Sequence, residues 1–249
     1  MLFWNKVKIG EILNGFTDWH THILPGVDDG VKTLEDSLLI LEEYERLGIS
    51  RVWLTPHIME DIPNEPGDLR RRAAELKSAY KGTVELRLAA ENMIDTLLSD
   101  RLAAGNLLPI GRGAARVSPE EETSGSGLLV ETSFFSPPMD LDGMLHSIRR
   151  AGYFPVLAHP ERYSYMTSRE YEKLKSDGVL FQLNLPSLSG FYGPSAKDRA
   201  EKFLKRGWYD FAGMDLHSYK SLMHIISGTI PEKLAARLTD LKGSEVIEG

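Results

Sequence analysis

The sequence predicts a parallel α/β fold that forms a single barrel-like domain over residues 1–249. Short apolar runs alternate along the chain with longer amphipathic segments, and no linker divides the chain into two parts. The length agrees with this prediction, because α/β barrels commonly reach about 250 residues as one domain.

The predicted elements follow one another as strand and helix. Apolar runs that each end close to a polar or ionisable residue predict strands at 16–19, 51–55, 84–89, 128–131, 154–157, 180–183 and 208–212. The first helix, at 34–47, is predicted by apolar residues at a spacing of three, namely Leu38, Leu41, Tyr44 and Leu47. Comparable patterns predict the other helices, at 68–80, 93–103, 141–151, 169–176 and 196–206. The segment 111–127 is rich in Gly, Ser and Glu, and we expect it to be a flexible loop, either a tolerated insertion or a lid.

The composition excludes several classes of protein. The chain contains no cysteine, which excludes a disulfide scaffold, a Cys-ligated zinc or iron–sulfur site and a thiolate nucleophile. A formal net charge of −7 disfavours broad attraction to nucleic acid or to an anionic membrane. No run approaches the ~18 apolar residues of a membrane span. We therefore expect a cytoplasmic protein that binds no nucleic acid and does not insert into a membrane.

Two histidines close the first predicted strand. Side chains at positions i and i+2 of an extended chain point the same way, so His20 and His22 can offer two imidazoles to one metal ion. A pair of surface histidines is an alternative, because His-x-His alone is a weak signal. Asp28 and Asp29 follow in a turn, where Asp before Gly is also ordinary turn chemistry. Only one of these two carboxylates need be a ligand.

Ionisable residues also follow the later strands. These candidate ligands are His57, Glu91, Glu131, His159, Asp215 and His217. In a barrel these strand ends meet on one face, and so many carboxylates lie together at low cost only when cations neutralise them. Nitrogen and oxygen ligands without sulfur suit Mn, Fe or Zn, and about nine candidates exceed what one ion uses. The sequence therefore predicts at least two metal ions.

A multimetal site of this kind is typical of enzymes that hydrolyse phosphate esters. Bound ions lower the pKa of a water toward ~7 and neutralise the phosphate oxygens, so that no protein nucleophile is required. Arg162 offers a planar fork of donors to a phosphate. Its alternative role is a salt bridge with Glu161 or with another acid at the surface.

From about residue 16 to 240, the motifs occur in an order that is similar to one known family. They are Asp18-x-His20-x-His22, LPGVDDG, TPH, Glu91, LVE, HPERY and DLH. Together they resemble the PHP-fold (polymerase and histidinol phosphatase) bacterial protein-tyrosine phosphatases of capsule and exopolysaccharide loci. The resemblance implies a single-domain distorted (β/α)7 TIM-like barrel with three divalent metal ions. The expected metal is Mn²⁺, and Fe and Zn are the alternatives.

The resemblance also implies roles for individual residues. The first ion would be held by His20, His22, Glu91 and Asp215. Glu91 would bridge to a second ion on Glu131 and His159, and the third would be held by Asp29, His57 and His217. Among the residues that act on the substrate would be Arg162, His159 and Asp215. The implied substrate is a phosphotyrosine protein, the C-terminal tail of a bacterial tyrosine kinase that regulates polysaccharide export.

The chain departs from the family pattern in three places. Lys220 stands near the position of a second phosphate-binding Arg, and it keeps the charge without the bidentate geometry. The segment 111–127 looks longer and more polar than the family's connection. Gly213 replaces a common Ser, a difference that we expect to matter little.

Three functions compete on the sequence alone. The first is a metal-dependent protein-tyrosine phosphatase. The second is a PHP-type phosphoesterase with the same ligands that acts on a small metabolite such as histidinol phosphate. The third is a metal-stabilised scaffold that binds a kinase tail without catalysis. Oligomerisation also stays open, with residues 1–4 and Phe134-Phe135 as candidate contacts, and a buried core position is the alternative for the two phenylalanines.

Overall fold

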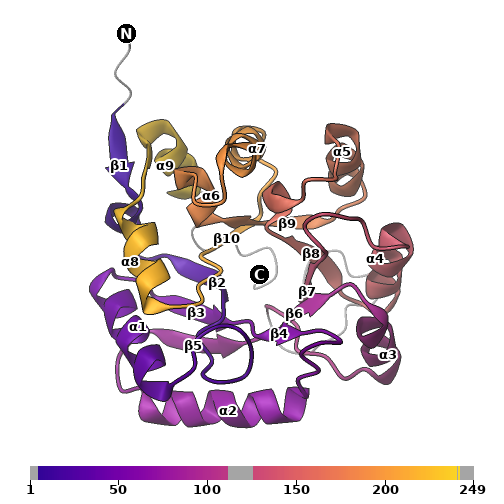
Figure 1. Cartoon of the computed structure of the whole chain (residues 1–249), viewed down its shortest axis with the longest axis horizontal. Helices are drawn as coiled ribbons and strands as arrows, with labels where there is room; N and C mark the ends of the chain where they lie inside the picture. The colour runs from indigo at the N-terminus through magenta and orange to yellow at the C-terminus, as the bar shows by residue number, and fades with distance from the viewer. Residues whose placement is uncertain (1–4, 112–125, 240, 242–249) are drawn as a thin grey trace.

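The structure is a computed structural model that describes residues 5–111, 126–239 and 241. Two parallel sheets form its centre (Figure 1). The larger has the strand order β10-β9-β8-β7-β6-β4, with β10 at Phe211–Gly213, β9 at Leu180–Asn184, β8 at Phe154–Ala158, β7 at Gly127–Glu131, β6 at Glu91–Met93 and β4 at His57–Ile58. The smaller has the order β2-β3-β5, with β2 at Thr17–Thr21, β3 at Arg51–Leu54 and β5 at Glu85–Leu88.

The two sheets meet at both edges and form one curled sheet. At one edge Thr21 bridges to Leu216 just beyond β10, and the backbone N–H of Asp215 donates to the carbonyl of His20 at 2.8 Å. On the other side the chain itself joins the two sheets, because β4 follows β3 after two residues and β6 follows β5 after two residues. The predicted curled parallel α/β architecture is confirmed at this level.

Helices cover the outer face of this sheet (Figure 1). They are α1 (Leu34–Arg46), α2 (Pro66–Ala79), α3 (Thr96–Ala104), α4 (Leu141–Arg150), α5 (Ser168–Ser176), α7 (Pro194–Lys205), α8 (Tyr219–Ser227) and α9 (Glu232–Thr239). Several begin at a side-chain cap, as where Thr33 accepts from the N–H of Asp36 and Asp95 accepts from the N–H of Leu98. None of the helices that the structure describes has the length and apolar character needed to cross a bilayer.

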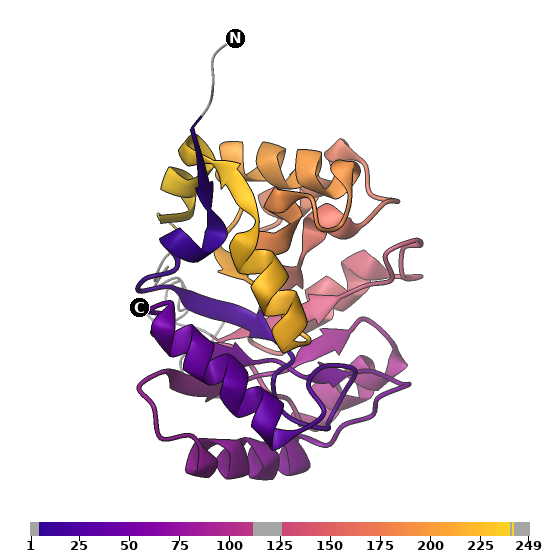
Figure 2. The ribbon, with the colours of Figure 1, turned by 60° about the vertical axis from the view of Figure 1, so that its left-hand side comes forward.

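Most predicted elements lie within a few residues of the observed ones, and the differences have local causes. The strand predicted at 208–212 begins only at Phe211, because the N–H of Trp208 still donates to the carbonyl of Phe203 in the turn after α7. The sequence prediction lacked the antiparallel pair of β1 (Lys6–Lys8) and β11 (Thr229–Pro231), the short helix α6 (Leu185–Ser189), α8 and α9. Figure 2 shows β1 beside β11 near the start of the chain. Of the predicted loop 111–127, residues 112–125 lie outside the described residues, as do residues 1–4.

Apolar side chains fill the inner face of the curled sheet. Trp19 and Trp53 stack with ring centroids 5.7 Å apart, and Phe211 lies 4.8 Å from Trp19. These rings pack with Leu129 and Val156 in a cluster separate from the core beneath the helices. The close packing of this interior holds the strand ends, and the polar groups on them, in fixed positions.

Gly213 matters more than the sequence suggested. A Cβ atom at this position would lie 2.6 Å from the Cβ of His20, and 2.7 Å from the backbone nitrogen of the same residue. The expectation that glycine in place of serine has little effect is therefore wrong for this backbone. Glycine lets β10 approach β2 closely, and this contact brings Asp215 to His20 and His22.

Candidate metal centre and phosphate site

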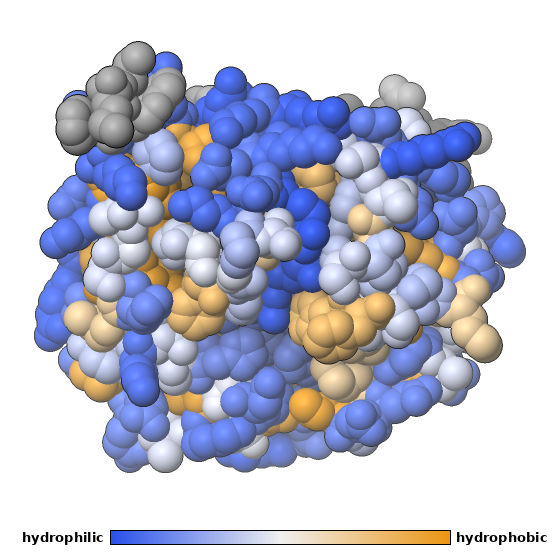
Figure 3. Space-filling model, turned by 45° about the horizontal axis from the view of Figure 1, so that its top comes forward, coloured by the Kyte–Doolittle hydropathy of each residue, from blue (hydrophilic) through white to orange (hydrophobic). Residues whose placement is uncertain are grey.

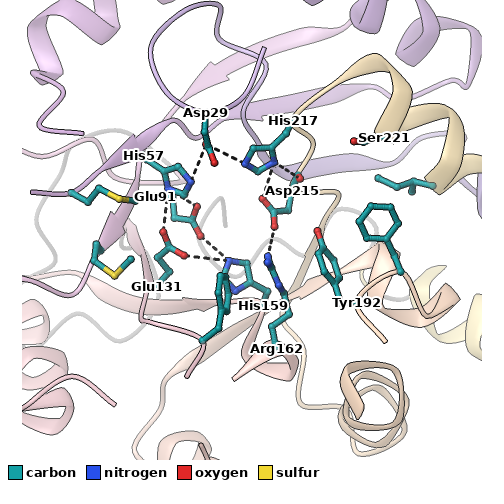
Figure 4. A pocket seen from close by; sticks show the side chains of 15 residues that line it. Asp29, His57, Glu91, Glu131, His159, Arg162, Tyr192, Asp215, His217 and Ser221 are labelled. Atoms are coloured by element: carbon teal, nitrogen blue, oxygen red, sulfur yellow. Dashed lines mark hydrogen bonds and ion pairs between the residues drawn. The ribbon is translucent and has the colours of Figure 1, made fainter. Parts of the chain in front are cut away.

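A cavity of ≈ 420 Å³ opens at the carboxyl ends of the strands. Its polar lining and the surrounding strands are shown in Figure 4. The residues that line it are Asp29, His57, Met59, Glu91, Met93, Glu131, Phe134, His159, Arg162, Phe191, Tyr192, Asp215, His217, Ser221 and Ile225. The face in Figure 3 is largely hydrophilic, with an apolar patch beside a central hollow.

All nine predicted metal ligands meet at this place. They form four groups in which the potential ligand atoms lie within 4.8 Å of one another. The groups are His22, Asp29, His57 and His217; His20, Glu91 and His159; His20, His22 and Asp215; and His57, Glu91 and Glu131. Parallel strands cause this convergence directly, since β4 and β6 pair with His57 opposite Glu91.

His20 in β2 and His22 just after it are oriented in a way that suits metal ligands. The Nδ1 of His20 lies 2.8 Å from the Oε1 of Gln182, and this oxygen also accepts the backbone N–H of His159. The Nδ1 of His22 lies 2.8 Å from a carboxylate oxygen of Asp28. Both Nδ1 atoms therefore act as donors, which leaves the lone pairs of neutral imidazole on the Nε2 atoms. These Nε2 atoms lie only 3.1 Å apart, an arrangement that fits a shared cation.

Glu91 lies at the centre of the cluster and is fully buried. Its Oε2 is 3.0 Å from the Nε2 of His20 and 3.2 Å from the Nδ1 of His57, and its Oε1 is 3.0 Å from the Nε2 of His159. Burial opposes the charge of this carboxylate, but His20 and His57 outweigh it and hold the pKa of Glu91 well below its usual range. Glu131 adds a second carboxylate 3.1 Å from the Nδ1 of His57. The two acids can bridge neighbouring ions.

A third group of candidate ligands lies around the exposed Asp29. The exposed Asp29 places Oδ1 3.4 Å from the Nε2 of His217 and 3.5 Å from the Nε2 of His57. Its hydrogen bond with His217 lowers the pKa of Asp29 to about 2. Asp28 is buried and directs its carboxylate to His22 and to the backbone N–H groups of Gly30 and His57. The two aspartates of the turn thus have different roles.

Backbone strain occurs at two of the candidate ligand positions. His159 has φ 33° and Asp215 has φ 50°, and among the described residues no other non-glycine residue has a positive φ. This region costs about 1–3 kcal/mol for a residue with a side chain. His159 directly follows β8 and Asp215 lies two residues beyond β10, and at both places the unusual turn directs the side chain into the cluster.

Arg162 reaches the same cavity from the short helix η2 (Pro160–Arg162). One terminal nitrogen lies 2.6 Å from the Oδ2 of Asp215. The alternative salt bridge with Glu161 is wrong, because the Glu161 carboxylate accepts instead from Asn184, Ser187 and Tyr209. Lys220 is exposed on α8 and is not among the residues that line the cavity, whereas its neighbour Ser221 is.

The sequence interpretation missed three polar residues of the site. Gln182 orients His20, Asn184 donates to the Oδ2 of Asp215 at 2.9 Å, and Tyr192 lines the cavity. Gln182 and Asn184 close β9 at positions i and i+2, the same spacing as His20 and His22. This spacing was the available signal, although amides are less suggestive of metal binding than imidazoles.

An Asp28→Asn variant should bind metal 10- to 100-fold more weakly, since ligand orientation by an outer carboxylate is worth about that factor. The amide keeps the size of the side chain but removes the charge that faces the Nδ1 of His22. Calorimetric titration of the metal-free protein with Mn²⁺ measures the change in metal affinity. Asp36→Asn is the matched control, because Asp36 accepts from Thr33 on the exposed start of α1. Equal affinities in the two variants would contradict the role given to Asp28.

The curled parallel sheet and the buried cluster at its carboxyl edge together define a barrel-like α/β protein with a site suited to divalent metal ions. The particular family follows from the sequence. The chain belongs to the family of capsular polysaccharide synthesis proteins CpsB/CapC, whose sequence model matches residues 16–227. The family resemblance stated from the motifs is thereby confirmed.

Curated relatives of this chain are named tyrosine-protein phosphatases. YwqE of Bacillus subtilis (strain 168) is 27% identical over 215 residues, which cover 82% of this chain and 78% of YwqE. CpsB of Streptococcus pneumoniae is 27% identical over 215 residues, which cover 82% of this chain and 84% of CpsB. The likeness extends over most of each protein.

Solved structures agree with this family. A structure from a study of YwqE from B. subtilis and CpsB from S. pneumoniae, described as unique metal-dependent tyrosine phosphatases, superposes with a TM-score of 0.69 at 25% identity. The match covers 92% of this chain and 89% of that one. The lactonase Lmo2620 from Listeria monocytogenes matches with a TM-score of 0.53 at 14% identity, which shows a shared fold alone.

Proposed function

We propose that this protein is a metal-dependent protein-tyrosine phosphatase. One observation carries the proposal: seven of the nine clustered candidate ligands line one cavity together with the guanidinium of Arg162, and His20 and His22 complete the cluster. Such a cavity brings metal ions and a guanidinium, which can donate two hydrogen bonds to a phosphate, to one substrate group. The names of the curated relatives support the same activity.

The metal content that we propose is three divalent ions, with Mn²⁺ as the native metal. The first is assigned to His20, His22, Glu91 and Asp215, the second to Glu91, Glu131 and His159, and the third to Asp29, His57 and His217. When bound, such ions supply an activated water and neutralise the charge of the phosphate. Arg162 would bind the phosphate oxygens, while His159 and Asp215 would complete the site on either side of Glu91.

The walls of the cavity favour an aromatic substrate. Beyond the cluster, the lining includes Phe134, Phe191, Tyr192, Met59 and Met93. Each carboxylate among the described lining residues belongs to the metal cluster, so none is left to bind the amine of a metabolite such as histidinol phosphate. We therefore place the phosphotyrosine ring against the apolar wall.

The proposal extends to partners and architecture. The substrate would be the tyrosine-rich C-terminal tail of a bacterial kinase that acts in capsule or exopolysaccharide export, and the enzyme would work in the cytoplasm. The whole chain would form one domain, a distorted (β/α)7 barrel in which β3 continues into β4 and β5 into β6. The pairing of β4 with β6 supports this count, because it follows the pairing of β3 with β5.

Phosphate release from a phosphotyrosine peptide and from histidinol phosphate tests the function. We expect activity on the peptide to disappear on chelation and to return with Mn²⁺, because the cluster needs cations to bind a phosphate. Alkylation of thiols serves as the control and should have no effect, since the chain has no cysteine. A folded protein that is equally inactive with and without metal would exclude the phosphatase. A preference for histidinol phosphate would change the substrate.

A further inference from the structure

Two aromatic rings enclose the guanidinium of Arg162. Its Cζ atom lies 4.1 Å from the ring centroid of Phe134 and 4.1 Å from the ring centroid of Tyr192. Phe134 comes from the loop after β7, and Tyr192 comes from the loop between α6 and α7. We call this pair of residues the aromatic clamp. Figure 4 shows the Tyr192 ring next to Arg162 at the cavity.

Hydrogen bonds alone do not fix this guanidinium. Among the described residues, its one hydrogen bond is the contact of 2.6 Å with the Oδ2 of Asp215. A guanidinium has five N–H donors, so the others are available to a ligand in the cavity. The side chain is 18% exposed, so most of its surface is in contact with the rest of the protein. The ring contacts restrict the guanidinium to one plane, and its edge donates to Asp215, which lines the cavity as Arg162 itself does.

Both parts of the clamp are themselves supported. The carbonyl of Phe134 accepts the N–H of Ser164, which ties its loop to the segment that carries Arg162. The hydroxyl of Tyr192 lies 3.4 Å from the Nδ2 of Asn184, which also donates to Asp215. The clamp is therefore connected both to the ligand cluster, through Asn184, and to the segment that carries Arg162, through Ser164.

We propose that Phe134 and Tyr192 are positioning residues that hold the Arg162 guanidinium edge-on to the cavity and so set the affinity for the substrate phosphate. This inference rests on the proposed function in that it takes phosphate as the ligand of Arg162. The two aromatic rings contact only the faces of the planar guanidinium. Its N–H groups point outward in the plane between the rings, so they keep a fixed direction and remain able to donate to the phosphate.

Binding of inorganic phosphate to the Mn²⁺-loaded protein tests the clamp without catalysis. Phe134→Leu and Tyr192→Leu remove one ring each but keep an apolar side chain. We expect each to weaken phosphate binding about fivefold, the scale of one partly exposed cation–π contact. The KM for a phosphotyrosine peptide should rise by a similar factor, while metal content measured by elemental analysis stays unchanged. Tyr192→Phe, which keeps the ring, should recover most of the loss.

Two further measurements separate positioning from a general structural effect. In the background of Arg162→Ala, Tyr192→Leu should cause no further loss of phosphate affinity, because the ring acts through Arg162. Trp208→Leu is the matched control. The Trp208 ring centroid lies 4.6 Å from the Cζ of Arg206, and neither residue is among those that line the cavity. This variant should leave phosphate affinity as it is.

The outcomes are distinct from those of the phosphatase assay. Wild-type affinity in both Leu variants would overturn the clamp, as would an equal loss in the Arg162→Ala background or absence of phosphate binding by the wild-type protein. If the wild-type protein binds phosphate but releases none from the peptide, the proposed function fails. The phosphate affinities of the variants then still decide whether the clamp positions Arg162.

Discussion

A Glu91→Gln variant is expected to lose more than about 100-fold in activity and part of its bound metal. The factor follows from comparison, because removal of a residue that merely orients a ligand already costs about 10- to 100-fold. Glu91 is fully buried, and its two oxygens face histidines from three different strand ends. The glutamine has the same shape but offers one neutral oxygen and one N–H₂ donor to nitrogens that need an acceptor or a metal.

Metal content measured together with the rate checks this prediction. The variant should contain fewer ions than the wild-type protein at the same Mn²⁺ concentration, and its circular dichroism should stay unchanged. Glu45→Gln is the matched control, since Glu45 accepts from Thr83 on the surface and is not among the residues that line the cavity. A Glu91→Gln protein with full metal content and the wild-type rate would contradict the central role that we give to Glu91 in the site.

The candidate ligands could be predicted from the sequence because they depend on local facts. His20 and His22 share a direction through strand geometry, and His57 and Glu91 become neighbours as soon as their strands are parallel. Metal binding also restricts the chemistry of the residues, so few residue types qualify. The candidate ligands therefore carried their own signals, at the strand ends and, for Asp29, in the turn after the first strand.

The partners of those ligands could not be predicted in the same way. Asp28 looked like a turn residue, and its contact with His22 depends on how the turn folds back over β2. Arg162 and Asp215 are 53 positions apart, and the rings on either side of Arg162 come from two loops. Such contacts depend on loop paths, which apolar periodicity does not describe. The same reason explains the missed pair of β1 and β11, because each strand has only three residues.

Glu161→Ala is expected to destabilise the protein by about 3–5 kcal/mol. The Glu161 carboxylate is completely buried and accepts three hydrogen bonds, from the N–H of Asn184 at 3.0 Å, the hydroxyl of Ser187 at 2.8 Å and the hydroxyl of Tyr209 at 2.9 Å. Burial raises the pKa of Glu161, and the hydrogen bond from Ser187 acts against this rise. Alanine leaves the three donors without an acceptor, and each buried donor left unsatisfied costs about 1–3 kcal/mol before the structure relaxes.

Thermal unfolding measures this loss, and for a chain of this size it corresponds to a decrease of roughly 10 °C in Tm. Glu172→Ala is the control, because the Glu172 carboxylate pairs with Arg206 at the surface and its loss should change stability by no more than about 0.5 kcal/mol. The comparison separates burial from charge, since both variants remove one carboxylate. Glu161 precedes Arg162 and is joined by its hydrogen bonds to the end of β9, so we expect this loss also to loosen the turn that carries Arg162. Equal stability of the two variants would show that the buried carboxylate contributes no more to the fold than an exposed one.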